Sequence, residues 1–297
     1  MTFEFWFMFP IAIVVATIAM STGVGGAIFF SPIFLIALKL EPTVAIGTAL
    51  ITELFGFSSG LFAYLRLKLI DFKMGWQVLR FAIPAAVVGA FVADFFPGIV
   101  LKTIFGVGII FVGTQIFTAW WGERREKMGK EIEKEQLELK EVTPDPDAKP
   151  YEKHVIVASD GRRFEYSVFN RAVAAMYSAI GGAFLGMISV GLAELMEYQM
   201  VAKCRIPPPV AVATSIFMVV VAVLAASVGH VISFVSAGSE TMLQVASISM
   251  FTAPGVLIGG QIGPFVQKIV PPETMKIVIS IVFVVVGVFM LSTLTVA

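Results

Sequence analysis

Apolar and polar positions divide most of the chain into eight long hydrophobic segments joined by short polar connections. The segments run over residues 5–38, 42–65, 74–96, 98–121, 169–202, 207–235, 241–267 and 271–295. A membrane-spanning helix needs about 20 apolar residues, so six of the segments predict one span each. The segments 5–38 and 169–202 are longer, and each contains a run of small residues near its middle.

These small-residue runs predict that both long segments are broken helices. Residues 21–26 read Ser-Thr-Gly-Val-Gly-Gly, and residues 186–191 read Gly-Met-Ile-Ser-Val-Gly. Glycine loses the most backbone entropy in a helix, and non-helical backbone at membrane depth is tolerated only inside protein or beside a polar cavity. Each half would be only about 20 Å long at a rise of 1.5 Å per residue. We therefore expect two hairpins that enter to the membrane midplane and return.

Prolines, glycines and hydroxyl residues recur in one order in the two halves of the chain, which indicates an internal repeat. Gly25, Pro42 and Thr48 match Gly191, Pro208 and Thr214 at one offset of 166 residues. Further matches at offsets of 170 and 174 residues are Pro84 with Pro254, Gly89 with Gly259, Pro97 with Pro271, Lys102 with Lys276, and Gly113 with Gly287.

The basic residues of the connections indicate how the two repeats are oriented. Three basic residues follow segment 42–65, and none follows its counterpart in the second half, segment 207–235. Two basic residues follow segment 169–202, and only Lys39 follows its counterpart in the first half, segment 5–38. The residues are Arg66, Lys68 and Lys73 in the first case, and Lys203 and Arg205 in the second. Lysine and arginine favour cytoplasmic loops, so the bias reverses between the halves, as in an inverted repeat.

We therefore predict an all-α integral membrane protein of two inverted-topology repeats, residues 1–121 and 169–297. Each repeat is a broken, re-entrant-like helix hairpin plus three transmembrane helices. This topology puts both termini outside the cytoplasm and the linker 122–168 inside it. Eight full spans in two parallel repeats, with both termini in the cytoplasm, are the alternative.

The insert 122–168 differs in character from the membrane segments. A charged stretch over residues 123–141 predicts a solvated helix, and the prolines at 144 and 146 end it. Two short apolar strands then flank Ser-Asp-Gly at residues 159–161, which is a β-hairpin signal. We expect the insert to be a cytosolic helix plus β-hairpin that serves as a tether between the repeats or as a docking element for a partner.

Composition agrees with a polytopic membrane protein and excludes several other classes. The chain is 58% hydrophobic and 14% charged, and its mean hydropathy is +0.90. Its formal net charge is zero, so it lacks the excess of basic residues that is typical of nucleic-acid-binding proteins. It has two histidines and one cysteine, Cys204, which excludes a disulfide scaffold and a cysteine-rich metal site. His154 and His230 lie far apart in the sequence, and no His–Ser or His–Cys spacing suggests an enzyme. We predict no cofactor.

The two breaks are the predicted binding site. A half-helix that begins at the midplane presents unpaired amides and the positive end of its dipole, and such ends bind anions. A neutral cage of amides and hydroxyls suits a small oxyanion that must bind and then leave, because a full charge is costly to bury. The predicted substrate-binding residues are Ser21, Thr22, Gly23, Gly25, Gly26, Gly47, Thr48, Ser189, Gly191, Thr214 and Ser215. Close helix packing is the alternative role for the small residues among them.

Polar residues inside the spans supply further candidates. Glu53 lies in the middle of segment 42–65, where an ionisable residue is a functional candidate by default. It is expected to carry a coupling proton, and a neutral glutamic acid that stabilises packing is the alternative. Gln115 and Gln261 are pathway candidates. Glu194 and Glu197 are expected at the membrane interface, and a ligand role is not expected for His230.

The chain resembles the TauE/SafE family of sulfite and organosulfonate exporters. The resemblance rests on the stretches 21–26, 31–35 (Ser-Pro-Ile-Phe-Leu) and 45–49 (Ala-Ile-Gly-Thr-Ala), with Pro42, Pro84, Gly89, Gly106 and Gly113 in the same order. It covers residues 10–121 and 169–297. It implies a multi-pass transporter of the cell membrane, with the turn at 23–26 and the pair Gly47–Thr48 as the site in the first half.

The resemblance implies a substrate among small sulfur-containing anions such as sulfite, sulfonates or thiosulfate. A carrier for another small anion or an amino acid on the same scaffold is one alternative. A membrane scaffold that acts through the insert 122–168 is another. The sequence favours no particular oligomeric state.

Overall fold

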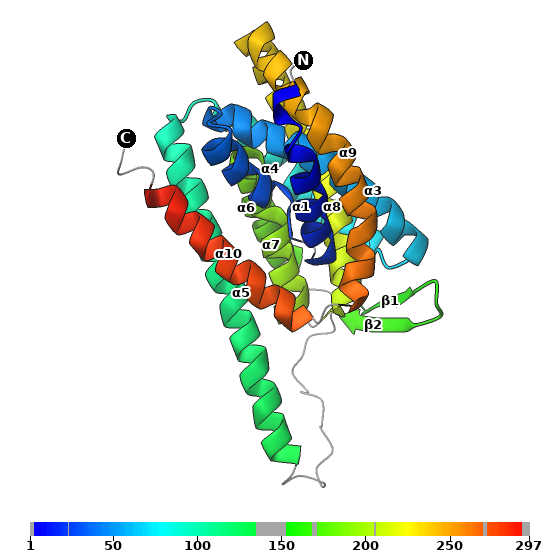
Figure 1. The fold of residues 1–297 in the computed structure, drawn as a ribbon. Coiled ribbons are helices and arrows are strands. Elements are labelled where there is room, and N and C mark those ends of the chain that lie inside the picture. The colour runs from blue at the N-terminus through cyan, green and yellow to red at the C-terminus, as the bar shows by residue number, and fades with distance from the viewer. Residues whose placement is uncertain are drawn as a thin grey trace.

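The computed structural model describes residues 3–22, 24–134, 153–167, 171–204, 206–269 and 272–292. These residues form helices and one β-hairpin (Figure 1). The elements of the first half are η1 (Phe3–Phe5), α1 (Met8–Thr22), α2 (Ala27–Pro32), the π-helical turn η2 (Ile33–Ala37), α3 (Pro42–Leu67), α4 (Phe72–Ala93) and α5 (Gly98–Lys134). The remaining elements are β1 (Lys153–Val157), β2 (Arg163–Ser167), α6 (Arg171–Ile188), α7 (Leu192–Glu197), the π-helical turn η3 (Tyr198–Lys203), α8 (Pro208–Ala237), α9 (Ser239–Ile269) and α10 (Pro272–Ser292).

The helices are those of a multi-pass membrane protein. Within the described residues, five helices are long and apolar enough to cross a bilayer: α3, α4, α8, the part of α5 over Gly98–Gly122 and the part of α9 over Ser239–Val266. Large apolar side chains are exposed on their outer faces, among them Phe81 on α4, Phe111 on α5 and Phe265 on α9. A water-soluble protein would bury such side chains, whereas in a bilayer they face lipid. The chain is therefore a predominantly helical integral membrane protein, with one β-hairpin among its described residues.

Both long apolar segments are interrupted near their middles. The first helix ends at Thr22 and the next begins at Ala27, and the second interruption separates Ile188 from Leu192. Ser189 and Gly191 adopt φ values of +59° and +124°, which a regular helix does not contain. The left-handed backbone at Ser189 therefore ends α6 sharply and redirects the chain into α7.

Helices α3 and α8 form the centre of the molecule. In their most apolar stretches 67% and 83% of the residues are buried, against 33% in α5. The two helices run antiparallel, because Thr43 near the start of α3 and Ser236 near the end of α8 line the same pocket. At the other end, Thr214 near the start of α8 contacts Asp71, just beyond the end of α3.

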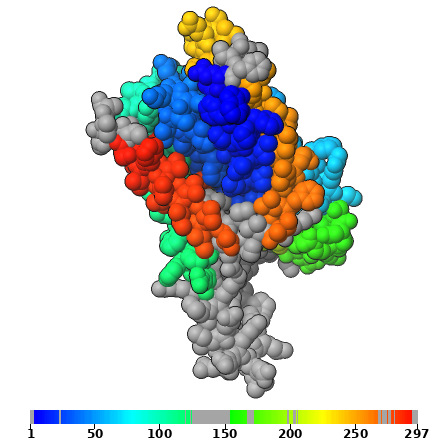
Figure 2. Space-filling model, in the orientation of Figure 1, coloured from blue at the N-terminus to red at the C-terminus, as the bar shows by residue number. Residues whose placement is uncertain are grey.

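The remaining helices pack in pairs that each join one half of the chain to the other. Helix α1 lies against α9, α4 against α6, and α5 against α10, and Figure 2 shows α1 in blue beside α9 in orange on one face. Small residues allow close approach in these pairs. A Cβ on Gly186 would meet the carbonyl oxygen of Ala86 at 1.9 Å, and one on Gly259 would meet that of Ile13 at 2.4 Å.

The insert begins as a continuation of a membrane helix. Helix α5 runs without interruption from Gly98 to Lys134, so the charged stretch from residue 123 extends a membrane helix and does not start a helix of its own. The rest of the predicted charged helix, over 135–141, lies outside the described residues. Strands β1 and β2 pair antiparallel with His154 opposite Tyr166.

The β-hairpin rests against the connection between α3 and α4. The Ser159 amide donates to the carbonyl oxygen of Leu67 at 3.0 Å. Asp71, the N-cap of α4, accepts hydrogen bonds from the Met74 amide, from the Tyr166 hydroxyl at 2.8 Å and from His154 Nδ1. Figure 1 shows the hairpin at the end of the molecule opposite the start of η1.

Candidate functional site

The two helix breaks meet at one carboxylate. The Gly25 amide, in the first break, donates to Glu194 Oε1 at 3.2 Å, and the Gly191 amide, in the second break, donates to Glu194 Oε2 at 2.9 Å. Glu194 is 8% exposed. A single buried side chain therefore bridges main-chain groups that are 166 residues apart in the sequence and equivalent in the predicted repeat.

Local sequence explains how Glu194 reaches the Gly191 amide. Leu192 is the first residue of α7, so Gly191 is the N-cap residue and Glu194 is the third residue of the helix. A glutamate at this position reaches back to the N-cap amide in the capping-box arrangement. The Gly25 amide supplies the second donor only because α2 begins beside α7 in the folded protein.

A second contact joins the two breaks. The hydroxyls of Ser31, in α2, and Ser189, in the second break, lie 2.8 Å apart, and both side chains are buried. Ser189 also donates to the carbonyl oxygen of its neighbour Ile188 at 2.6 Å. Polar contacts thus join the first break to α7 and the second break to α2.

A second carboxyl group lies beside the first. Glu53, on α3, is 1% exposed, and neither of its carboxyl oxygens has a hydrogen-bond partner among the described residues. A Cβ placed on Gly25 would lie 3.1 Å from Glu53 Oε1 and 3.3 Å from Glu194 Oε1. The amides of Gly26 and Ala27 face Glu53 without making a regular hydrogen bond. Two buried carboxyl groups therefore flank the start of α2.

Some of the predicted site residues lie at this junction. Gly25, Gly26 and Gly191 lie beside the two carboxyl groups, and Ser189 joins the second break to Ser31. Gly23 lies outside the described residues.

The hydroxyls that precede the first break are engaged within α1. Ser21 donates to the carbonyl oxygen of Ile18 at 2.8 Å, and Thr22 donates to the same atom at 2.9 Å. The Val24 amide in turn donates to the Thr22 hydroxyl at 3.4 Å. The two side chains thus form hydrogen bonds with main-chain groups at the end of α1 and at the start of the break.

The predicted residues of α3 and α8 make contacts elsewhere. A Cβ on Gly47 would meet Phe234 at 2.4 Å, so this glycine allows α3 to approach α8. The Thr48 hydroxyl donates to Val44 O and the Ser215 hydroxyl to Val212 O, both within their own helices. Thr214 accepts from the Asp71 amide at 3.0 Å, which places it beside the α3–α4 connection.

The two glutamines also lie apart from the breaks. Gln261 donates to the carbonyl oxygen and the hydroxyl of Ser59 at 2.6 and 2.8 Å and so joins α9 to α3. Gln115 is partly exposed on α5. Neither residue has a described hydrogen bond to a residue of the two breaks.

The expectation that Glu194 lies at the membrane interface is wrong. Its carboxylate is buried between the two breaks, because Glu194 lies in the first turn of α7 and its oxygens accept the amides of Gly25 and Gly191. The spacing of Gly191 and Glu194 was the available sequence signal, since it is that of an N-cap and its capping glutamate. The side chain of Glu197 lies outside the described residues. His230 is also buried, and its Nε2 lies 3.0 Å from the Gly186 carbonyl oxygen.

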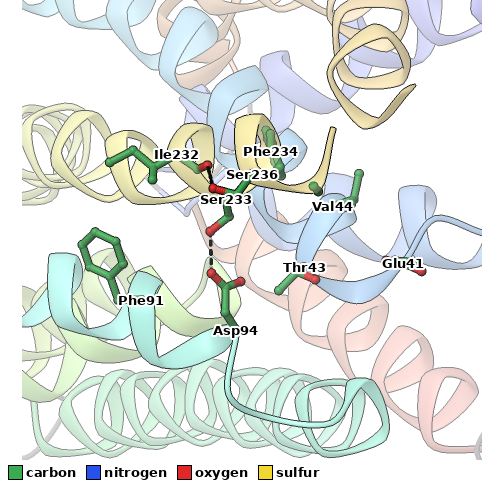
Figure 3. Close-up of a pocket in the computed structure, with 10 residues that line it drawn as sticks. Glu41, Thr43, Val44, Phe91, Asp94, Ile232, Ser233, Phe234 and Ser236 are labelled. Atoms are coloured by element: carbon green, nitrogen blue, oxygen red, sulfur yellow. Dashed lines mark hydrogen bonds between the residues drawn. The ribbon is translucent and has the colours of Figure 1, made fainter. Parts of the chain in front are cut away.

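A pocket of about 330 Å³ opens at the end of the molecule away from the hairpin. It lies where α3 begins and where α4 and α8 end, and Glu41 and Asp94 are among its lining residues. Figure 3 shows the Ser233 hydroxyl directed at the Asp94 carboxylate, with Phe91 and Phe234 on either side. Phe234 is buried between this pocket and Gly47.

Among the described residues, no group of three or more histidine, cysteine, aspartate or glutamate side chains is placed to hold a metal ion. The chemistry available at the junction is that of main-chain amides, two serine hydroxyls and two carboxyl groups. Such groups bind and release ions and protons.

Comparisons with known proteins place the chain among membrane transporters. A family model described as Sulfite exporter TauE/SafE matches residues 8–290. The chain is 24% identical over 291 residues to "Probable membrane transporter protein YunE" of Bacillus subtilis (strain 168), a match that covers 96% of each chain. It is 25% identical over 253 residues to "Probable membrane transporter protein YjnA" of the same organism, covering 82% of this chain and 84% of the relative. No solved structure shows a significant match.

Proposed function

The chain belongs to the TauE/SafE sulfite exporter family, and from that premise we propose that it is a secondary transporter that exports small sulfur-containing anions. Sulfite and organosulfonates are the proposed substrates, and the cell membrane is the proposed location. The proposed binding site is the junction of the two breaks, formed by the Gly25 and Gly191 amides with Gly26, Ser31 and Ser189. Ser31 is added to the predicted set because its hydroxyl joins that of Ser189.

The bridging carboxylate of Glu194 is the observation that carries this proposal. Its two oxygens accept one amide from each break, at 3.2 and 2.9 Å, so the two donors are spaced to bind two oxygens of a single oxyanion. Sulfite and sulfonate groups present pairs of oxygens on one central atom in a similar way. Amide donors hold such an anion without a buried positive charge, which would be costly in the membrane.

Alternating access between the two halves is the proposed mechanism. The antiparallel arrangement of α3 and α8 supports an inverted repeat, because these helices occupy equivalent places in the two halves. In transporters built from inverted repeats, a midplane site is exposed to one side and then to the other when one unit rocks against its partner. Here the site would open when α2 and α7 separate.

The distribution of charge supports transport from the hairpin side to the pocket side. Arg66, Lys68 and Lys73 are exposed beside the hairpin, whereas Glu41 and Asp94 line the pocket at the opposite end. Basic residues attract an anion and acidic residues repel it. The positive-inside rule makes the basic side cytoplasmic, so an anion would be captured from the cytoplasm, and its own outward concentration gradient would drive export.

Glu53 is the proposed coupling residue. It is buried beside the proposed anion site and lacks a hydrogen-bond partner among the described residues. An ionisable group at membrane depth commonly belongs to an ion or proton pathway. A proton is therefore the proposed coupling ion.

Flux measurements in reconstituted vesicles test the proposal. Vesicles would be loaded in turn with sulfite, thiosulfate, sulfoacetate, sulfate or an amino acid, and the efflux of each solute would be followed. The wild-type protein is expected to release the sulfur-containing anions selectively. Gly25→Leu should abolish this flux at unchanged expression, because its side chain would enter the space between Glu53 and Glu194.

Gly108→Ala is the control for Gly25→Ala, the smaller substitution at the site, because a Cβ on Gly108 would meet only Ile188 at an ordinary distance of 3.6 Å whereas one on Gly25 would lie 3.1 Å from Glu53 Oε1. The control variant should transport as the wild type does. Selective amino-acid flux would favour a different carrier, and undiminished flux in Gly25→Leu would place the binding site elsewhere.

A further inference from the structure

We propose that Glu194 is an internal competitor of the transported anion: its carboxylate holds the two break amides in the empty transporter, and it must be protonated for the substrate to take its place. The inference rests on the proposed function and adds to it a definite link between anion and proton. Each monovalent anion that binds would bring one proton into the site.

The geometry makes occupancy by Glu194 and by substrate mutually exclusive. The Gly25 and Gly191 amides that are proposed to bind the substrate are already bound by the two oxygens of Glu194. An anion that used the same donors would lie against a carboxylate in a buried site, where the repulsion of like charges is weakly screened. Substrate binding therefore requires that Glu194 lose its charge and release the amides.

Glu53 is placed to deliver the proton. Its Oε1 and Glu194 Oε1 lie 3.1 and 3.3 Å from the same point, the position of a Cβ on Gly25. The groups described in contact with Glu194 are the Gly25 and Gly191 amides, and the hydroxyls of Ser31 and Ser189 contact each other. His230, on the neighbouring α8, is turned to the carbonyl oxygen of Gly186. None of the ion pairs within the described residues involves either glutamate.

The proposed exchange conserves charge at the site. In the empty state Glu53 is a neutral acid and Glu194 is the carboxylate. Glu53 passes its proton to an oxygen of Glu194 and takes another proton from the aqueous side, while the substrate anion takes over the two amides. The site thus holds one negative charge before and after binding, and the net event is the entry of one anion and one proton.

A purely structural role for Glu194 makes a different prediction. Glutamate and glutamine both serve as the third residue of a capping box. Glu194→Gln therefore keeps the cap of α7, while its side chain can neither carry the negative charge nor take up a proton. This substitution separates the proton-linked role from the structural one.

Proton uptake upon anion binding tests the proposal. Methanesulfonate, a fully ionised monoanion, would be added to the purified protein in weakly buffered detergent solution containing a pH indicator. The wild type should take up about one proton per bound anion, and its affinity should fall by about tenfold per pH unit in the alkaline range. Glu194→Gln should bind the anion without proton uptake, and its affinity should not depend on pH.

Glu240→Gln, the same substitution on the exposed start of α9, is the control and should behave as the wild type. Binding without proton uptake by the wild type would overturn the inference and leave the proposed function standing. Equal proton uptake by the wild type and Glu194→Gln would also overturn it. Absence of methanesulfonate binding in both would remove the proposed sulfonate site and the inference with it.

Discussion

Asp71 and Glu53 are both buried carboxyl groups, but they differ in the number of hydrogen bonds that they accept. Asp71 is 3% exposed and accepts hydrogen bonds from the Met74 amide, His154 and the Tyr166 hydroxyl. Glu53 is 1% exposed, and neither of its oxygens has a partner among the described residues. The first lies where the hairpin docks, and the second lies where the two helix breaks meet.

Asp71 is therefore expected to stabilise the fold through its hydrogen bonds, and Glu53 is not. A buried polar group without a partner costs about 1–3 kcal/mol, and in native proteins such a group calls for an explanation. The hydrogen bonds of Asp71 offset the free-energy cost of burying its carboxylate, and they join α4 to both strands of the hairpin. Glu53 makes no such contribution within the described structure, and this contrast supports a role in ion or proton movement.

Asp71→Ala is expected to have the largest effect of the variants that test this comparison. It would leave the Met74 amide, His154 Nδ1 and the Tyr166 hydroxyl without their acceptor, and we expect docking of the hairpin to weaken by about 3–5 kcal/mol. Hydrogen exchange of residues 153–167 measures the loss of protection. Asp160→Ala is the control, because Asp160 pairs only with Arg162 at the exposed tip of the hairpin. Retained protection in Asp71→Ala would show that the cluster does not hold the hairpin.

Glu53→Leu tests the other side of the comparison. We expect transport to fall by at least about 100-fold, which is about 2.7 kcal/mol of barrier. The midpoint of thermal unfolding, Tm, should stay the same or rise, because the substitution removes a buried group that has no partner. Flux in vesicles and thermal unfolding in detergent measure the two quantities. A large fall in Tm would mean that Glu53 supports the fold as Asp71 does.

Much of the fold could be predicted from the sequence, because the signals for it are local. Hydrophobic segment length indicates the membrane helices. The glycine and serine runs indicate where the two long segments are interrupted, as the helix ends at Thr22 and Ile188 show. Ser-Asp-Gly at residues 159–161 likewise coincides with the turn between β1 and β2.

The arrangement of the site was harder to predict, because it depends on how distant segments meet. Glu194 has a visible local partner in Gly191, but its bond to Gly25 exists only once α2 lies beside α7. Thr48 and Thr214 are equivalent in the predicted repeat, yet one donates within its own helix and the other accepts from Asp71. Helix rotation and neighbours decide such contacts, and periodicity alone does not show them.

The smallest expected effect concerns Tyr166 and depends on pH. Burial, followed by the hydrogen bond to Asp71 and its charge, raises the pKa of the Tyr166 hydroxyl above its ordinary value of about 10. A group whose pKa is raised in the docked state stabilises docking below its ordinary pKa. That contribution is lost as the pH rises further, because the undocked tyrosine ionises first.

Tyr166→Phe should therefore weaken docking by about 1 kcal/mol at neutral pH, through loss of one hydrogen bond. Above a pH of about 10 the wild type should lose this advantage while the variant stays level, so the two should converge. Cleavage of the hairpin by a protease that is active in alkali, measured across this pH range, follows both proteins. Parallel curves would show that the Tyr166 hydroxyl does not link docking to pH, and the Asp71 cluster would then owe its stability to His154 and the Met74 amide.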